Sequence, residues 1–339
     1  MQVHFLAQKQ LPAFNKAVVT IGSFDGVHLG HRLIIDQLKK EAALIGGETV
    51  IISFYPHPRS VIAKNPENVK LLCTLEEKIS LLEATEIDHL VIVPFNLDFA
   101  HQSAESYISN FLYHNFHPHT VIIGYDHRFG NNRVGDYHLM DAFGKQLGFK
   151  VKEIPEHILN EVVISSTKIR HAITDNAIEI ANQFLGYPYF FEGTVIKGNQ
   201  LGRTLGFPTA NISVLYPNKL IPGNGVYAVT ARIKNSKTSI DSSHLQKKEH
   251  QSKDSVLKGM MNIGVRPTVD GINRVIEVNL FDFNEDIYDK TLQVFVHHYI
   301  RGEIKFSGLD ALKEQLAKDK ISVIEKAVKI GFEFKNGEL

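Results

Sequence analysis

Two histidines stand three residues apart where a predicted buried strand gives way to a predicted helix. The run from Gly22 to His31 is G-S-F-D-G-V-H-L-G-H, so His28 and His31 fall on the first helical turn and face the same way. Gly22, Gly26 and Gly30 allow a ligand to approach the backbone closely. A helix N-terminus attracts anions, and two imidazoles there can donate hydrogen bonds to phosphate oxygens. The run indicates a phosphate site, although an isolated H-x-x-H is more often a turn followed by exposed histidines.

A second run of polar residues precedes another helical pattern. Ser165, Ser166 and Thr167 are followed within one turn by Lys168 and Arg170. Hydroxyl side chains at a helix start usually serve only as N-caps. Three hydroxyls and two cations offer more donors than a cap requires, and they favour the binding of a polyphosphate.

A glycine-rich segment in the second half of the chain has neither Walker spacing nor G-x-G-x-x-G. Gly198, Gly202 and Gly206 make a loop able to wrap phosphates, and Thr209 and Asn211 supply hard oxygen ligands of the kind that magnesium accepts. On composition alone, a glycine-rich barrel loop that ends in an edge-strand proline is the commoner structure.

The elements that must position the first two runs alternate between strand and helix. Such alternation predicts an open, doubly wound parallel sheet whose ligands lie beyond the carboxyl ends of the strands. The predicted strands are 17–21, 49–54, 90–94 and 120–123, and the predicted helices are 29–44, 75–84, 104–113 and 177–185.

After residue 185 the pattern changes to β-branched and aromatic runs with turns between them. This pattern predicts a small antiparallel barrel or sandwich. The candidate strands are 190–196, 225–233, 257–263, 275–281 and 292–299, and an amphipathic helix over about 309–330 could cover one open end. The polar stretch 234–256 indicates a surface insertion, because its acidic residues disfavour a basic tail for nucleic acid.

Composition sets limits on the class of protein. The 339 residues suggest two domains, and the 37 basic side chains balance the 37 acidic ones, so we expect neither a nucleic-acid nor a membrane partner. Cys73 is the single cysteine, which excludes an internal disulfide and a multi-thiolate zinc site and favours a cytoplasmic location. The run His114, His117, His119 is expected to be an exposed loop rather than a metal site.

The first two runs resemble the H-x-G-H and S-S-T-x-[IL]-R elements with which the nucleotidyltransferase superfamily holds ATP. Between them, residues 54–58 and 124–130 are similar to the FMN-adenylylating module of the bacterial bifunctional riboflavin kinase/FAD synthetase family, with Ser23 and His127 as departures. The resemblance covers roughly 17–185. It implies that an FMN phosphate oxygen attacks the ATP α-phosphorus, and that His28, His31, Arg170 and a magnesium ion neutralise the developing charge. The implied ligand-binding residues are Gly22, Phe24, Gly30, Asp126, Ser165, Ser166, Thr167 and Lys168.

The run G-R-T-L-G-F-P-T-A-N at 202–211 resembles the riboflavin kinase signature of the same family, and later elements recur in family order. The resemblance implies a six-stranded barrel in which Thr209 and Asn211 hold magnesium-ATP, Glu277 is the base and Arg301 lies near the flavin. Without the family, Glu277 between two apolar residues would be typical of the solvated face of a strand. The other implied binding residues are Gly198, Gly202, Arg203, Gly206, Phe207 and Pro208.

Together these patterns predict an α/β doubly wound, Rossmann-like nucleotidyltransferase domain over 1–186 and an antiparallel β-barrel riboflavin kinase domain with a C-terminal helix over 187–339. The predicted function is phosphorylation of riboflavin to FMN and adenylylation of FMN to FAD, with ATP, riboflavin and FMN as substrates. Two alternatives stay open: a nucleotidyltransferase for another phosphate acceptor, which leaves the second half unexplained, and a flavin-binding regulator without turnover. The sequence does not give the oligomeric state.

Overall fold

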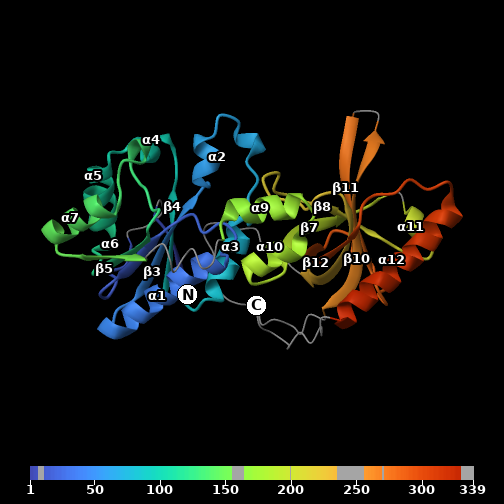
Figure 1. Cartoon of the computed structure of the whole chain (residues 1–339), viewed down its shortest axis with the longest axis horizontal. Helices are drawn as coiled ribbons and strands as arrows, with labels where there is room; N and C mark the ends of the chain where they lie inside the picture. Colours follow the sequence, from blue (N-terminus) through green and yellow to red (C-terminus); the bar gives the residue numbers. More distant parts are fainter. Residues whose placement is uncertain (7–10, 155–163, 199, 235–255, 269–270, 330–339) are drawn as a thin grey trace. The chain divides into compact units, whose positions relative to one another are not determined.

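A computed structural model describes the chain except for residues 7–10, 155–163, 199, 235–255, 269–270 and 330–339 (Figure 1). The chain divides into two compact units, Met1–Lys168 and Ile169–Glu338. Most of the expected insertion at 234–256 lies outside the described residues. Among the described residues, no helix combines the length and the apolar character that crossing a membrane requires.

The first unit is built on a six-stranded sheet in which every neighbouring pair is parallel. The strand order is β1-β4-β3-β2-β5-β6. From β2 the chain adds β3 on one side and β5 on the other, so the carboxyl ends of β2 and β5 form a topological switch point, where such sheets bind ligands. The strands are β1 (Gln2–Phe5), β2 (Val18–Ile21), β3 (Thr49–Tyr55), β4 (His89–Pro94), β5 (Thr120–Gly124) and β6 (Lys150–Ile154).

Helices pack against this sheet, and their ends follow local sequence signals (Figure 1). A capping box of Thr74 and Glu77 begins α3, and Gly46 ends α1 in the left-handed conformation. The helical segments are α1 (Leu29–Ile45), α2 (Pro58–Ile62), η1 (Pro66–Asn68), α3 (Leu75–Glu83), α4 (Leu97–His101), α5 (Ala104–Ser106), η2 (Tyr107–Tyr113), α6 (His114–Phe116), η3 (Asn131–Arg133) and α7 (Tyr137–Leu147).

Alternate residues of the central strands form one apolar core. Val19 of β2, Ile52 of β3 and Val91 of β4 are fully buried, and they belong to the same cluster as Phe111 and Phe116. Because strand side chains alternate between faces, this cluster covers one face of the sheet, and helix α1 contacts β2, β3 and β5. This packed core therefore holds the carboxyl ends of the strands in fixed positions.

The second unit is a closed antiparallel barrel in the order β10-β11-β8-β7-β12-β9. Closure removes every free strand edge. The strands are β7 (Tyr189–Ile196), β8 (Ala210–Ser213), β9 (Gly225–Lys234), β10 (Leu257–Thr268), β11 (Gly271–Leu280) and β12 (Thr291–Arg301). The helices are α9 (Ser166–Thr174), which spans the division between the units, α10 (Ile178–Leu185), α11 (Leu201–Thr204) and α12 (Leu309–Lys329).

Two helices pack on the barrel wall. The Asn182 side chain of α10 donates to the Val296 carbonyl at 2.9 Å and accepts from the Tyr189 amide at 2.7 Å. These bonds tie α10 to the barrel, whereas the sequence analysis groups it with the preceding domain. Helix α12 packs against β9, β10 and β12, where Val323 joins Met260 in a buried cluster (Figure 1).

The predicted fold class is confirmed in both units, and each predicted strand is present within one or two residues except that β10 and β11 run further. The elements not predicted from the sequence are β1, β6, β8, α7 and the short helical segments α2, η1, α4, α6, η3 and α11. Strands β1 and β6 are the edges of the sheet, and β6 reads K-V-K-E-I, with three exposed residues that hide its strand character. Strand β8 is four residues long and begins inside the glycine-rich motif.

A buried histidine makes the stability of the barrel depend on pH. His297 of β12 is buried, and its Nε2 atom lies 2.8 Å from the Thr230 hydroxyl of β9. Burial, assisted by His298, lowers the pKa of His297 from 6.5 to about 4. The unfolded chain therefore takes up this proton at a higher pH than the folded chain, and acid favours unfolding.

We expect the free energy of unfolding of the barrel to fall as the pH drops from about 6.5 toward 4, with His297 contributing roughly 3 kcal/mol at most. Urea unfolding of the wild type and of His297→Gln at several pH values measures this contribution. Glutamine keeps a partner for Thr230 but does not titrate, so its stability should vary less with pH. Parallel pH profiles for the two proteins would contradict the assignment.

Candidate active sites

The loop after β2, residues 22–28, carries two left-handed residues that are not glycine. Phe24 has φ 47° and Val27 has φ 35°, with Gly26 at φ 83° between them. A β-branched residue in this region is strained, and such strain persists only where the surroundings hold it. This loop, called the histidine loop below, lies at the switch point of the sheet.

The segment before α3 holds the histidine loop. The carboxylate of Asp25, which is 1% exposed, accepts from the backbone amides of Leu72 at 2.9 Å and Cys73 at 3.2 Å. The Gly26 amide in turn donates to the Cys73 sulfur at 3.1 Å. These contacts fix the backbone between the two strained residues.

The two histidines lie ring against ring at the start of α1. His28 is the N-cap residue, and its ring is stacked on that of His31 with centroids 3.7 Å apart and 17° between the planes. The Phe24 ring lies 4.9 Å from that of His31. A Cβ atom at Gly30 would come within 3.2 Å of His28 Nδ1, so any larger residue there would press on the pair.

The environment of His31 keeps its imidazole neutral. Burial lowers its pKa well below 6.5, and the nearby His28 and Lys78 lower it further. Within the described residues, its buried Nδ1 atom has no hydrogen-bond partner. A neutral imidazole donates one hydrogen bond without adding charge. His31 can therefore orient a phosphate oxygen, but positive charge must come from another group.

The hydroxyl side chains at the start of α9 have different partners. Ser165 Oγ accepts from the Lys168 amide at 3.3 Å, the bond expected of an N-cap. Ser166 Oγ donates to the Asp25 carbonyl at 3.1 Å and so joins this run to the histidine loop. Thr167 and Lys168 are exposed, and Arg170 lies further along α9, past the division between the units.

The two segments that resemble the FMN-adenylylating module, residues 54–58 and 124–130, lie at the carboxyl ends of strands β3 and β5. Phe54 belongs to an aromatic cluster with Phe95 and Phe99, each 5.5 Å away. Asp126 is exposed. Burial lowers the pKa of His127 to about 4, although Asp126 opposes the shift, and its Nε2 atom has no hydrogen-bond partner among the described residues. Among those residues no group of three or more His, Cys, Asp or Glu side chains could hold a metal ion. His114 and His117 are exposed, but the expected loop is wrong in part, because His114 begins helix α6 and His119 is half-buried.

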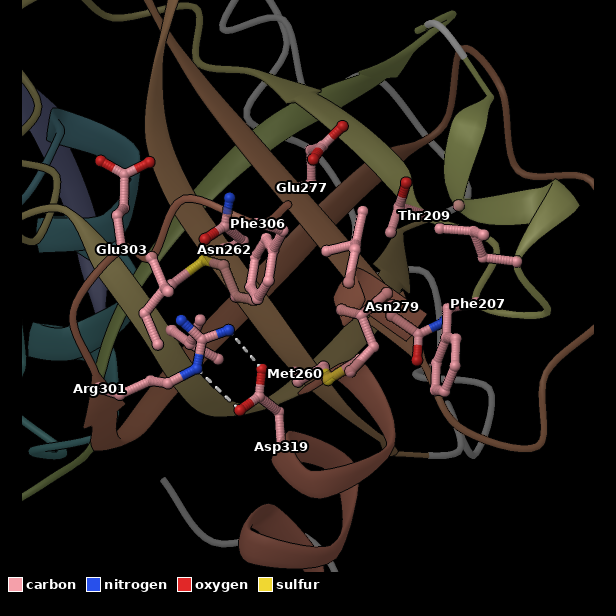
Figure 2. Close-up of a pocket in the computed structure, with 17 residues that line it drawn as sticks. Phe207, Thr209, Met260, Asn262, Glu277, Asn279, Arg301, Glu303, Phe306 and Asp319 are labelled. Carbon is pink, nitrogen blue, oxygen red and sulfur yellow. Dashed lines mark hydrogen bonds and ion pairs between the residues drawn. The ribbon is translucent and has the colours of Figure 1, made fainter. Parts of the chain in front are cut away.

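An open pocket in the second unit lies between the barrel and α12 (Figure 2). The cavity has a volume of about 190 Å³ and is open to solvent. Five residues expected from the sequence line it: Gly202, Phe207, Thr209, Glu277 and Arg301. The other expected residues of this unit, Gly198, Arg203, Gly206, Pro208 and Asn211, are not among the lining residues.

Glu277 lies on β11 directly opposite Asn211 of β8. Directly paired residues project to the same face of a sheet, so the carboxylate and the buried amide of Asn211 are neighbours. Figure 2 shows Glu277 and Thr209 among the sticks that line the pocket. The arrangement gathers a carboxylate, an amide and a hydroxyl at one part of the barrel wall.

The glycine-rich loop is packed too closely for side chains at two positions. A Cβ atom at Gly198 would collide with the Asn211 amide, and one at Gly202 with the Phe207 carbonyl oxygen. The Pro208 carbonyl accepts from Asn279 Nδ2 at 2.7 Å, which anchors the loop to β11. Gly206 has φ 84° and, like Arg203, is exposed. The glycines thus bring the loop against the residues that carry polar oxygens.

Arg301 is held in the pocket by a carboxylate that the sequence analysis missed. Its Nε and Nη2 atoms donate to the two oxygens of Asp319 at 2.8 and 2.6 Å, as the dashed lines in Figure 2 show. Asp319 is 2% exposed and also accepts from Gln315 at 2.9 Å. Asp319 interrupts the apolar stripe of Leu312, Leu316 and Val323 on α12. A charged residue on the apolar face of a predicted helix is the sequence signal by which Asp319 could have been found.

Comparisons with known proteins cover both units. A family model described as FAD synthetase matches residues 11–168, and one described as riboflavin kinase matches residues 185–327. A bifunctional riboflavin kinase/FMN adenylyltransferase from Haemophilus influenzae is 36% identical over 89% of this chain and 91% of its own length. The proteins of that name from Escherichia coli K12 and Listeria monocytogenes are 35% and 38% identical, over 91% and 89% of this chain and 92% and 90% of their own.

A solved structure described as a macrolide-efflux protein from Streptococcus pneumoniae shares the fold. It is 26% identical with a TM-score of 0.79, and the match covers 95% of this chain and 98% of that one. The two matched family models, the relatives aligned over nearly their whole length and the two candidate sites agree. The chain belongs to the family of bifunctional riboflavin kinase/FMN adenylyltransferases.

Proposed function

We propose that the two reactions of this family are divided between the two units. The chain phosphorylates riboflavin to FMN with ATP and adenylylates FMN to FAD with release of pyrophosphate. The observation that carries the division is the pocket of the barrel, where Glu277 and Thr209 line a cavity inside the part that matches riboflavin kinase. We propose a functional boundary near residue 186, because the match to the riboflavin kinase model begins at residue 185.

For adenylylation, the histidine loop and the start of α9 would bind ATP. An FMN phosphate oxygen attacks the α-phosphorus in line, and pyrophosphate leaves with the electrons of the broken P–O bond, so alignment and charge stabilisation account for the catalysis. His28 and His31 would donate hydrogen bonds to the reacting phosphate, and Arg170 would add positive charge. Gly22, Phe24, Gly30, Asp126, Ser165, Ser166, Thr167 and Lys168 would hold the nucleotide and the flavin.

For phosphorylation, Glu277 would be the base. The ribityl hydroxyl oxygen attacks the ATP γ-phosphorus while its proton passes to the Glu277 carboxylate, and ADP leaves. Arg301, fixed by Asp319, would contact the flavin. Gly198, Gly202, Arg203, Gly206, Phe207 and Pro208 would surround the nucleotide.

Magnesium is the cation that we propose for the kinase site. The hydroxyl of Thr209 and the amide oxygen of Asn211 are hard ligands, and magnesium in nucleotide sites takes few protein ligands beside the substrate phosphates. Asn211 lies opposite Glu277 across β8 and β11, and Thr209 and Glu277 line the pocket, so the donor set at this part of the barrel consists of hard oxygens. When bound, magnesium would neutralise charge on the ATP phosphates. A cytoplasmic location is also proposed, since Cys73 is the single cysteine.

Thr209→Val tests the metal assignment because it removes the hydroxyl and keeps the shape. We expect the magnesium concentration for half-maximal FMN formation to rise by about tenfold, while FAD formation from supplied FMN keeps its magnesium dependence. Products are separated after incubation with riboflavin, ATP and magnesium. Ser213→Ala, at the far end of the strand β8 that follows Thr209, is the matched control. An unchanged magnesium requirement in Thr209→Val would contradict the assignment.

A further inference from the structure

A buried lysine lies behind the histidine loop. Lys78 of α3 is 5% exposed, and its Nζ atom donates to Ser53 Oγ at the end of β3 at 3.1 Å. Ser53 Oγ in turn donates to the Ser23 carbonyl of the histidine loop at 3.2 Å. A continuous polar path thus runs from α3 through β3 to the loop that leads into the histidine pair.

Burying an ammonium is costly unless other charges compensate. Burial lowers the pKa of Lys78, while the thiol of Cys73 and the carboxylate of Asp25 raise it again. An ammonium has three protons to donate, and among the described residues Ser53 accepts one of them. The chain keeps this lysine buried next to β3, although an apolar side chain would cost less to bury there.

The effect of Lys78 reaches His31. Burial is the main cause of the lowered pKa of His31, and His28 on the histidine loop and Lys78 on α3 lower it further. Asp25 of the loop is the carboxylate that balances Lys78. A positive charge on Lys78 disfavours protonation of the His31 ring, so a neutral His31 can donate a hydrogen bond while the positive charge is on the lysine.

We propose that Lys78 is a positioning residue for FMN adenylylation, which holds the histidine loop through Ser53 and supplies buried positive charge near the stacked rings of His28 and His31. The proposal rests on the assignment of adenylylation to the first unit. ATP and the transition state are strongly anionic, and a charge in a buried site is screened far less than one in water. The hydrogen bond from Ser53 to Ser23 also holds the loop in which Phe24 and Val27 are strained.

Lys78→Met tests the charge, because methionine has a similar length and no charge. With FMN and ATP supplied, we expect kcat/KM for FAD formation to fall by about tenfold or more, less than for a group that touches the reacting phosphate. NMR titration of labelled histidines, with His31 assigned by comparison with His31→Gln, should show a higher pKa for His31 in Lys78→Met. A structural role alone would not move that titration.

Three further variants make the outcome decisive. Lys78→Arg keeps the charge and should keep both the low His31 pKa and most of the activity. Ser53→Ala removes the hydrogen bond and should lower kcat/KM while leaving the His31 pKa low. Lys39→Met, which removes a surface lysine of α1 that pairs with Glu86, should change neither.

Unchanged FAD formation in folded Lys78→Met overturns the proposal. If Lys78→Met does not fold, Lys78→Arg decides: a folded arginine variant that loses activity with an unshifted His31 titration shows that the charge is not what matters. FMN formation from riboflavin in every variant reports on the second unit. A wild-type protein that forms FMN but no FAD from supplied FMN would refute the assigned reaction itself rather than the role of Lys78.

Discussion

Replacing Glu277 by glutamine is expected to lower riboflavin phosphorylation by roughly 10²- to 10⁴-fold, the range for loss of a general base. The ribityl hydroxyl has a high pKa and needs a carboxylate within hydrogen-bond reach to accept its proton during attack. Glutamine keeps the shape and the pairing with Asn211 across β8 and β11, but it cannot take the proton. ATP binding should therefore change little while kcat falls.

The measurement compares FAD made from riboflavin with FAD made from supplied FMN. Glu277→Gln should fail with the first and succeed with the second, because adenylylation uses the other unit and a phosphate nucleophile that is already charged. Glu285→Gln, an exposed acid just after the same strand, is the matched control. Full kinase turnover in Glu277→Gln would show that Glu277 is not the base and is only a solvated residue of the strand.

Replacing His31 by alanine is expected to lower FMN adenylylation by roughly 10²- to 10³-fold, as the loss of one preorganised donor does elsewhere. Riboflavin phosphorylation should stay nearly intact. His28→Ala should have a similar effect, and the double variant should lose less than the product of the two. The rings are stacked 3.7 Å apart, so each substitution already disturbs the other histidine.

Steady-state rates of FAD formation from FMN and of FMN formation from riboflavin check this expectation in the same preparations. His138→Ala on α7, an exposed histidine of the first unit, controls for loss of an imidazole as such. Equal loss of both activities in His31→Ala, with the fold retained by circular dichroism, would show that the two reactions do not use separate sites.

The sequence predicted the helices and strands whose apolar residues recur with a regular spacing. It missed the elements and attachments that depend on contacts with residues distant in the sequence. The four central strands of the sheet read as apolar runs, whereas edge strand β6 alternates lysine with valine and looks like a loop. Helix α10 has a clear amphipathic pattern, but its attachment to the barrel depends on Asn182, which only the folded chain brings to β7 and β12.

The same limit applies to the sites. His28 and His31, the hydroxyl run at 165–167 and the glycine-rich loop could be found because each is a local motif with a recognisable spacing. Lys78 and Asp319 could not, since each acts on a residue from a distant part of the chain. In sequence Lys78 follows two glutamates at the start of a helix and looks solvated, and its burial comes from packing against β3.

The pairing of the barrel sets an order in which the two sites can arise during synthesis. All six strands of the parallel sheet precede residue 168, so a ribosome has delivered the whole first unit before any barrel strand emerges. The barrel cannot close until its last strand has been synthesised, because its first strand β7 pairs with its last strand β12. The ion pair of Arg301 forms later still, since its partner Asp319 is on the helix after β12. The site that consumes FMN can thus be complete while the site that produces it is still being made.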